Sequence, residues 1–346
     1  MFVVGILTAV SASFGQNLKP VRVSLRSIGS PQFPTGYHLS DSDPHFRHSG
    51  DKLFWLNSDS VAITFFKEFC CPSGGHSGIK HGAAVFDTSG NAVGTHDLVS
   101  LPDTPFLLEG GVGSFLLIYD SHIDALKSNF DKLGRITVSH FISPRLSTDG
   151  SQIAVSDRGK LSVYGTADLI SKATLTLPSG TEVADMNDHA VLLNAKSKSA
   201  CDIVVWQTGG GASWKVSFRP DEYGGCSTGY GEGLLSDDAI VIRKGNPNTR
   251  EIVSRNGHVE TISEEGDLLG TASSGRFALQ RFFPSAFADA LDMDFGGKRA
   301  ITVYDPSQKR LIFRKKFGGQ TAAALAPDGH HLAVIEGNNL LIYPLP

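Results

Sequence analysis

The sequence has little net charge and no long apolar segment. Its 346 residues include 31 lysines and arginines against 35 aspartates and glutamates, which gives a formal charge of −4. A chain that binds nucleic acid needs clustered lysines and arginines to neutralise the phosphates. The densest basic stretch here, residues 309–316, alternates basic with apolar residues, which is the pattern of a strand with one face in solvent. No run is long and apolar enough to cross a bilayer. We therefore expect neither a nucleic-acid partner nor a membrane span.

Helical periodicity is also missing. No stretch of about 12 residues repeats its apolar positions at helical spacing, and the segments between turn residues fit only short strands. The chain is 40% hydrophobic and 9% aromatic, with 38 glycines and 16 prolines. This content is sufficient for a packed interior and excludes a disordered chain, so we expect an all-β protein.

The N-terminus has the pattern of an export signal. Met1–Val10 is mostly apolar and is followed by small residues up to Gly15. An apolar region of this length before small residues is typical of a secretory signal peptide and is too short to span a membrane. We predict a signal peptide at residues 1–15, a single domain at 16–346, and export to the periplasm or the extracellular space. The start lacks basic residues, so a buried strand is the alternative interpretation.

Two motifs recur along the chain in a constant order. The first is a short glycine or aspartate turn followed directly by an apolar strand, which indicates the turn between two antiparallel strands. It occurs seven times, at 49–56, 113–119, 149–155, 187–193, 237–242, 274–279 and 328–334.

The second motif is an apolar strand that ends in an aromatic residue and a polar turn. Its clear copies end at Phe86, Tyr164, Trp206, Tyr304 and Tyr343, and weaker copies lie at 125–131 and 251–257. Successive aromatics are 78, 42, 98 and 39 residues apart, and the two long gaps are each close to two periods. A period of about 40 to 50 residues with four strands per unit is typical of propeller blades.

Seven copies predict a seven-bladed β-propeller closed by its N-terminus. The last copy ends at Tyr343, which leaves no residues for a fourth strand. Val21–Ile28 alternates apolar and polar residues and belongs to no blade of its own. We expect this segment to complete the last blade and so to cover an otherwise open sheet edge.

The best copy of the first motif carries a family resemblance. Leu325–Ile335 contains Ala-Pro-Asp-Gly before its strand, and Leu146–Val155 repeats the pattern as Ser-Thr-Asp-Gly. These turns resemble those of WD-repeat-like propellers, in particular the exported Tol-type subgroup. The resemblance implies a propeller that binds a ligand across one face, and fold alone does not identify that ligand.

Long insertions fall on one predicted face of the ring. Antiparallel strands alternate in direction, so the connection between strands two and three of a blade emerges on the same side as the connection to the next blade. Two long connections of this kind are 69–81 in blade 1 and 283–297 in blade 6. Loops of this length on a rigid scaffold are the usual place for binding. We name as candidate binding residues Cys70, Cys71, His76, His81, Tyr223, Tyr230, Phe283, Asp292 and Asp294.

The four cysteines are predicted on this same face. Cys201 begins the third strand of blade 4 and Cys226 precedes blade 5, so a disulfide between them is our prediction for an exported protein. Cys70 and Cys71 are neighbours, and a bond between them would be strained. A mixed pairing with Cys201 or Cys226, and two free thiols, are the alternatives.

The residues of the same loop also suggest a metal site as an alternative. His76 and His81 follow the cysteine pair, but the spacing fits no standard thiolate and imidazole ligand pattern. Asp292 and Asp294 lack the alternating acids and the terminal glutamate of a calcium loop. We expect no metal and no cofactor.

These observations predict an exported, non-catalytic binding module. Its partner would be a protein, a peptide or a glycan bound on the insertion-rich face. The alternative is a propeller hydrolase or a lactonase-like enzyme, in which acids gather around a metal at the central channel.

Overall fold

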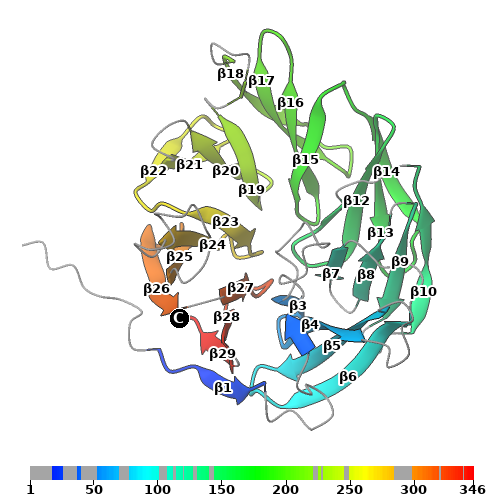
Figure 1. The fold of residues 1–346 in the computed structure, drawn as a ribbon. Helices are drawn as coiled ribbons and strands as arrows, with labels where there is room; N and C mark the ends of the chain where they lie inside the picture. The colour runs from blue at the N-terminus through cyan, green and yellow to red at the C-terminus, as the bar shows by residue number, and fades with distance from the viewer. Residues whose placement is uncertain are drawn as a thin grey trace, which may run out of the picture.

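The computed structural model describes residues 18–25, 37–39, 53–69, 78–100, 107–111, 114–119, 121–127, 131–139, 144–220, 225–226, 229–244, 249–283, 298–318, 321–337 and 339–346. These residues form seven antiparallel sheets around a central axis (Figure 1). The described part of the chain contains no helix that could cross a membrane. The predicted signal peptide at 1–15 lies outside the described residues.

Each sheet is one blade, numbered here in chain order. Blade 1 contains β2 (Tyr37–Leu39), β3 (Leu53–Asn57), β4 (Ser60–Phe69), β5 (Gly78–Asp87) and β6 (Ala92–Ser100). Blade 2 contains β7 (Leu107–Gly111), β8 (Ser114–Ile118), β9 (His122–Lys127) and β10 (Lys132–Thr137). Blade 3 contains β11 (Arg145–Leu146), β12 (Gln152–Asp157), β13 (Lys160–Gly165) and β14 (Ser171–Thr176).

The remaining blades follow the same four-strand order. Blades 4 and 5 contain β15 (Thr181–Met186), β16 (Ala190–Lys196), β17 (Cys201–Gln207) and β18 (Trp214–Phe218), and β19 (Tyr230–Ser236), β20 (Ala239–Lys244), β21 (Thr249–Ser254) and β22 (Val259–Ile262). Blades 6 and 7 contain β23 (Asp267–Thr271), β24 (Phe277–Phe283), β25 (Lys298–Asp305) and β26 (Arg310–Gly318), and β27 (Thr321–Leu325), β28 (His331–Glu336), β29 (Asn339–Pro344) and β1 (Val21–Ser24).

The N-terminal strand closes the ring, as the sequence predicted. β1 pairs antiparallel with β29, with Val21 opposite Ile342 and Val23 opposite Leu340. In Figure 1 the dark blue β1 lies beside the red β29 at the outer edge of blade 7. The edge of β29 is therefore paired within the chain.

The hydrophobic cores lie between neighbouring blades. Among the described residues, seven apolar clusters fill the seven blade interfaces. The cluster between blades 4 and 5, for example, joins Leu192 and Ile203 of one sheet to Leu234 and Ile240 of the next. Alternating apolar side chains on both faces of each blade build these interfaces, which fixes each blade relative to its neighbours.

The aspartate-glycine turns are explained by local backbone chemistry. Gly150 and Gly329 have φ of 70° and 76°, a region that glycine adopts without steric cost. In both turns the preceding aspartate accepts a backbone N–H two residues on, from Ser151 over 2.8 Å and from His330 over 2.9 Å. These are Asx turns, and they make the first motif a reliable marker of the connection between strands one and two.

The predicted turn at the start of the 49–56 copy lies outside the described residues, and its strand is β3, an inner strand that pairs with β4. β2 pairs with the far end of the same β4, through Leu39 opposite Phe65. The first strand position of blade 1 is therefore shared by two segments, and the turn to strand two lies at Ser58–Asp59.

Candidate functional site

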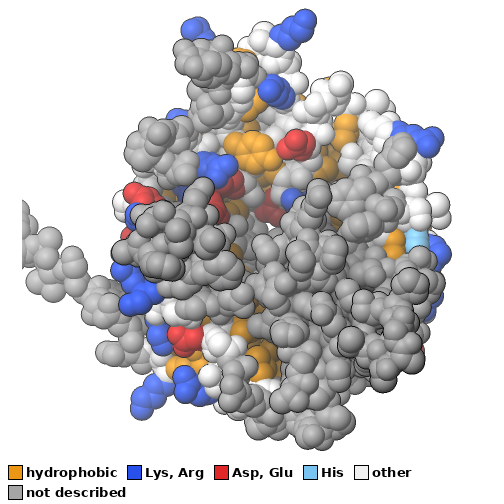
Figure 2. All heavy atoms as spheres, in the orientation of Figure 1, with side chains coloured by type: hydrophobic (Ala, Val, Ile, Leu, Met, Phe, Trp, Pro, Cys, Tyr) orange, Lys and Arg blue, Asp and Glu red, His pale blue; other side chains and the backbone are white. Residues whose placement is uncertain are grey.

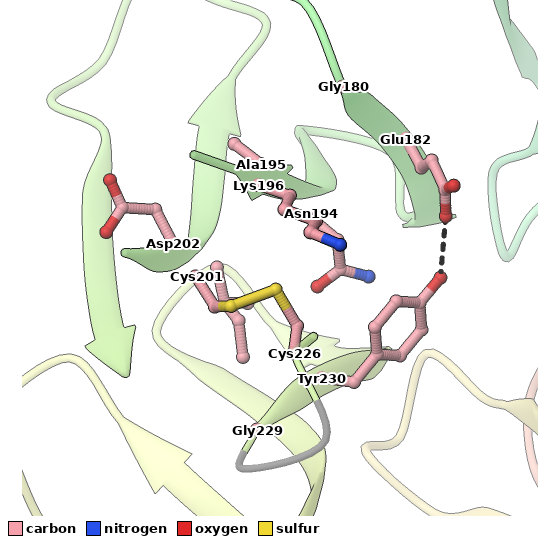
Figure 3. Close-up of a pocket in the computed structure, with 11 residues that line it drawn as sticks. Gly180, Glu182, Asn194, Ala195, Lys196, Cys201, Asp202, Cys226, Gly229 and Tyr230 are labelled. Atoms are coloured by element: carbon pink, nitrogen blue, oxygen red, sulfur yellow. Dashed lines mark hydrogen bonds between the residues drawn. A yellow bond between two sulfur atoms is a disulfide. The ribbon is translucent and has the colours of Figure 1, made fainter. Parts of the chain in front are cut away.

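A pocket lies between blades 4 and 5 on the predicted insertion face. It has a volume of about 210 Å³ and is lined by residues of β15, β16, β17 and β19 and of the connections that lead into β15 and β19 (Figure 3). Its lining residues are Gly180, Glu182, Asn194, Ala195, Lys196, Cys201, Asp202, Ile203, Cys226, Gly229 and Tyr230. This volume is below the roughly 300 Å³ of common small-molecule pockets, so it suits a single side chain or sugar unit.

Tyr230 and Glu182 define one end of the pocket. The Tyr230 hydroxyl donates to Oε2 of Glu182 over 3.1 Å, across the boundary between the blades (Figure 3). Burial and the negative charge of Glu182 raise the pKa of Tyr230, so the hydroxyl stays protonated and remains a donor. Glu182 forms no ion pair with a described lysine or arginine.

Two other polar side chains of the pocket, Asn194 and Asp202, are already engaged. The Asn194 side chain donates to the Gly231 carbonyl and accepts the Gly231 N–H, both over 2.9 Å. Asp202 accepts the Ser217 hydroxyl over 2.6 Å and Lys215 Nζ over 3.0 Å, and these contacts lower the pKa of Asp202. Asn194 therefore serves to fix β19 against β16.

A disulfide forms the opposite wall. Cys201 at the start of β17 is bonded to Cys226 in the connection between β18 and β19. This connection crosses from blade 4 to blade 5, so the bond ties it to the side of blade 4 next to Asn194 (Figure 3). Ile203 and Ala195 complete a wall that is mainly apolar.

Three successive inner strands share one local distortion at this face. Each has a β-bulge, between Val183 and Asp185, between Gly231 and Gly233, and between Leu268 and Gly270. Counted from the bulge, Glu182, Tyr230 and Asp267 occupy the same position in blades 4, 5 and 6. Figure 2 shows acidic side chains gathered near the centre of the ring, around the position of β15 and β19 in Figure 1. Bulges reorient side chains in this way next to binding sites.

A second charged group adjoins this row in blade 5. The Arg250 side chain is fully buried and donates to Glu232 over 2.7 Å through Nε. Arg243 lies 3.4 Å from Glu232 and 3.7 Å from Asp267, whose side chain is 84% exposed. The positive charges are thus held by nearby carboxylates, while Asp267 extends into solvent.

The structure brings together three of the residues predicted for the site. Tyr230, Cys201 and Cys226 all line the pocket. Phe283 ends β24 in blade 6, away from this pocket, with Arg281 4.9 Å and Lys316 4.6 Å from its ring centre. His81 belongs to β5, opposite Phe66, so this part of the predicted loop is strand. Cys70, Cys71, His76, Tyr223, Asp292 and Asp294 lie outside the described residues.

Two pocket residues were missed by sequence reasoning. Glu182 and Asn194 belong to no spacing motif, because the pocket arises only where two blades pack. A usable signal was present in the blade repeat, since Glu182 and Asp267 lie within the first two residues of equivalent inner strands. No group of three or more histidine, cysteine, aspartate or glutamate side chains is arranged to hold a metal within the described ranges.

The fold is similar to that of solved propellers. The WD40 domain of Neurospora crassa Pan2 superposes with a TM-score of 0.52 at 11% identity, over 96% of this chain and 98% of that one. The uncomplexed Pyrococcus horikoshii acylaminoacyl peptidase gives 0.54 at 10% identity, over 86% of this chain and 51% of that one. This chain therefore spans about half the length of that peptidase.

A third similar structure differs in its closure. The β-propeller domain of the Trilobed protease from Pyrococcus furiosus has a TM-score of 0.51 at 10% identity, over 86% of this chain and 92% of that one, and is described as having an open velcro topology. Here β1 pairs with β29. No protein family and no curated protein matches the sequence. The chain is a seven-bladed β-propeller that resembles WD40 domains and peptidase propellers, and identities this low show the fold alone.

Proposed function

We propose that this protein is an exported, non-catalytic propeller that binds a protein, peptide or glycan partner through the insertion-rich face. The pocket between blades 4 and 5 is the contact site. The observation that carries this proposal is the exposed Glu182 carboxylate held by Tyr230 at the rim of an apolar pocket. An aromatic ring beside an available charge is typical of the central contacts of interfaces.

The disulfide supports export. Bonds such as that between Cys201 and Cys226 persist in oxidising compartments and are rare in the cytosol. It also holds the pocket wall in place before a partner arrives, which lowers the entropy cost of binding. Mass spectrometry of the protein recovered outside the cytoplasm tests the export step, with residues 1–15 expected to be removed. Recovery of the intact N-terminus from the cytosol would contradict it.

Binding is tested by comparing two faces of the ring. Fluorescently labelled protein is applied to a random peptide array and to a glycan array. We expect Tyr230→Ala to weaken the strongest signals by about tenfold, as removal of a central aromatic contact does. The control is His189→Ala, an exposed residue in the turn between β15 and β16 on the opposite face. Equal losses in the two variants, or none in Tyr230→Ala, would refute the site.

A further inference from the structure

We propose that the pocket between blades 4 and 5 takes a basic side chain, arginine or lysine, from an extended partner peptide. This inference rests on the proposed binding function and specifies its ligand. The strongest support is that Asn194 and Asp202 are hydrogen-bonded within the protein, which leaves the Glu182 carboxylate to bind a ligand.

The first step is to find the free polar group. Both ends of the Asn194 amide are used by the backbone of Gly231, and the Asp202 carboxylate is held by Ser217 and Lys215. Among the described residues, the Glu182 carboxylate accepts a hydrogen bond only from the Tyr230 hydroxyl, and Glu182 is exposed. A carboxylate has about four acceptor positions, so it retains room for further donors.

The second step is the shape and chemistry of the walls. The disulfide, Ile203 and the Tyr230 ring form an apolar surface that leads toward Glu182. Arginine and lysine have an apolar stem and a charged head that only donates hydrogen bonds. The stem suits this surface, and the head would meet both a carboxylate and an aromatic ring, which attracts cations.

The surroundings favour a peptide over a sugar. Sugar recognition relies on several polar side chains, and Asn194 and Asp202 of the pocket are already paired within the protein. Lys196 lies opposite Cys201 on β16 and also lines the pocket, and an ammonium group donates hydrogen bonds of the kind that a peptide carbonyl accepts. Asp267 holds the position equivalent to Glu182 two blades away, but it lies 3.7 Å from Arg243 and 4.0 Å from Arg250, so Glu182 is the carboxylate of this row that is available to a basic ligand.

The test uses an array of heptapeptides with a fixed central residue and random flanks. The central residue is arginine, lysine, glutamine, leucine or glutamate, and all peptides are acetylated and amidated. We expect arginine and lysine peptides to bind the wild-type protein about fivefold or more tightly than glutamine peptides at low salt. This preference should decrease as salt increases.

Two substitutions at one position make the result specific. Glu182→Gln keeps an acceptor for Tyr230 and should reduce binding of arginine peptides about fivefold. Glu182→Lys should move the preference toward glutamate peptides. The matched control is Asp238→Asn, which removes a 70% exposed carboxylate on the opposite face and should leave binding unchanged. Thermal unfolding of each variant establishes that it is folded.

The outcomes separate this inference from the proposed function. Peptide binding with no preference for a basic centre, or an unchanged preference in Glu182→Gln, would overturn the basic-ligand inference alone. Binding to a neutral oligosaccharide array without peptide binding would also overturn it and keep the proposed function. An absence of binding to both arrays would overturn the proposed function as well.

Discussion

The backbone N–H of Leu234 in blade 5 donates to the Asp185 carboxylate in blade 4 over 2.7 Å. The Thr271 hydroxyl in blade 6 lies 3.4 Å from the same oxygen. One side chain thus links the inner strands of three blades just below the row that contains Glu182 and Tyr230. Burial raises the pKa of Asp185 to about 6, although its hydrogen bonds and Arg145 act in the opposite direction.

This pKa predicts a pH-dependent stability. The folded value is above the ordinary 3.8, so the native state binds the proton more tightly than the unfolded chain. The contribution of Asp185 is complete below pH 3.8 and is lost as pH rises through about 6. The asparagine of Asp185→Asn cannot titrate. The unfolding free energy of this variant minus that of wild type should therefore increase by about 2 kcal/mol as pH rises from 4 to 7.

Urea unfolding at the two pH values measures this difference. Asp238→Asn, which removes an exposed carboxylate with one long ion pair to Arg255, is the control and should show little change. A difference between Asp185→Asn and wild type that stays constant with pH would show that Asp185 does not titrate in this range.

The disulfide should stabilise the pocket wall. Cys201 and Cys226 enclose a separation of 25 residues, for which loop-closure entropy predicts a contribution of about 3.5 kcal/mol. Reduction should therefore lower the urea midpoint of the wild-type protein. The double variant Cys201→Ala with Cys226→Ala should start at the lower midpoint and not respond to reductant. Equal midpoints for oxidised and reduced wild type would contradict this contribution.

The closing strand should be required for a stable ring. Val23 packs against the core between blades 7 and 1 and lies opposite Leu340. Val23→Asp places a charge at this core and should lower the unfolding free energy by more than about 2 kcal/mol. Arg22→Asp, on the exposed side of the same strand, should change it by less than about 0.5 kcal/mol. Thermal unfolding compares the two, and similar losses would argue against a packing role for Val23.

Repetition made most of the fold predictable from the sequence. The aromatic ends Phe86, Tyr164, Trp206, Tyr304 and Tyr343 all lie on third strands, because each blade needs the same apolar strand at that place. The closing strand was predictable since Tyr343 left its blade one strand short. These features are local patterns repeated in phase, and chance does not keep such a phase over seven units.

The features that the sequence did not predict have a common physical cause. No repeat motif predicted that β2 and β3 share one strand position, because this arrangement depends on the pairing of both with β4. The pocket was only partly predicted for the same reason, since Glu182 meets Tyr230 across a blade boundary, 48 residues away in sequence. Contacts between blades are set by tertiary packing and leave no spacing motif.

Hydrogen exchange in the presence of a partner tests the central claim most directly. The strongest arginine-centred peptide from the array is added to the protein, and backbone exchange is followed by mass spectrometry. We predict slower exchange in residues 180–182, 194–196 and 229–231, which border the pocket, and no change in the turns at 187–189 and 236–238 on the opposite face. Protection of those turns with unchanged exchange around Tyr230 would contradict the account.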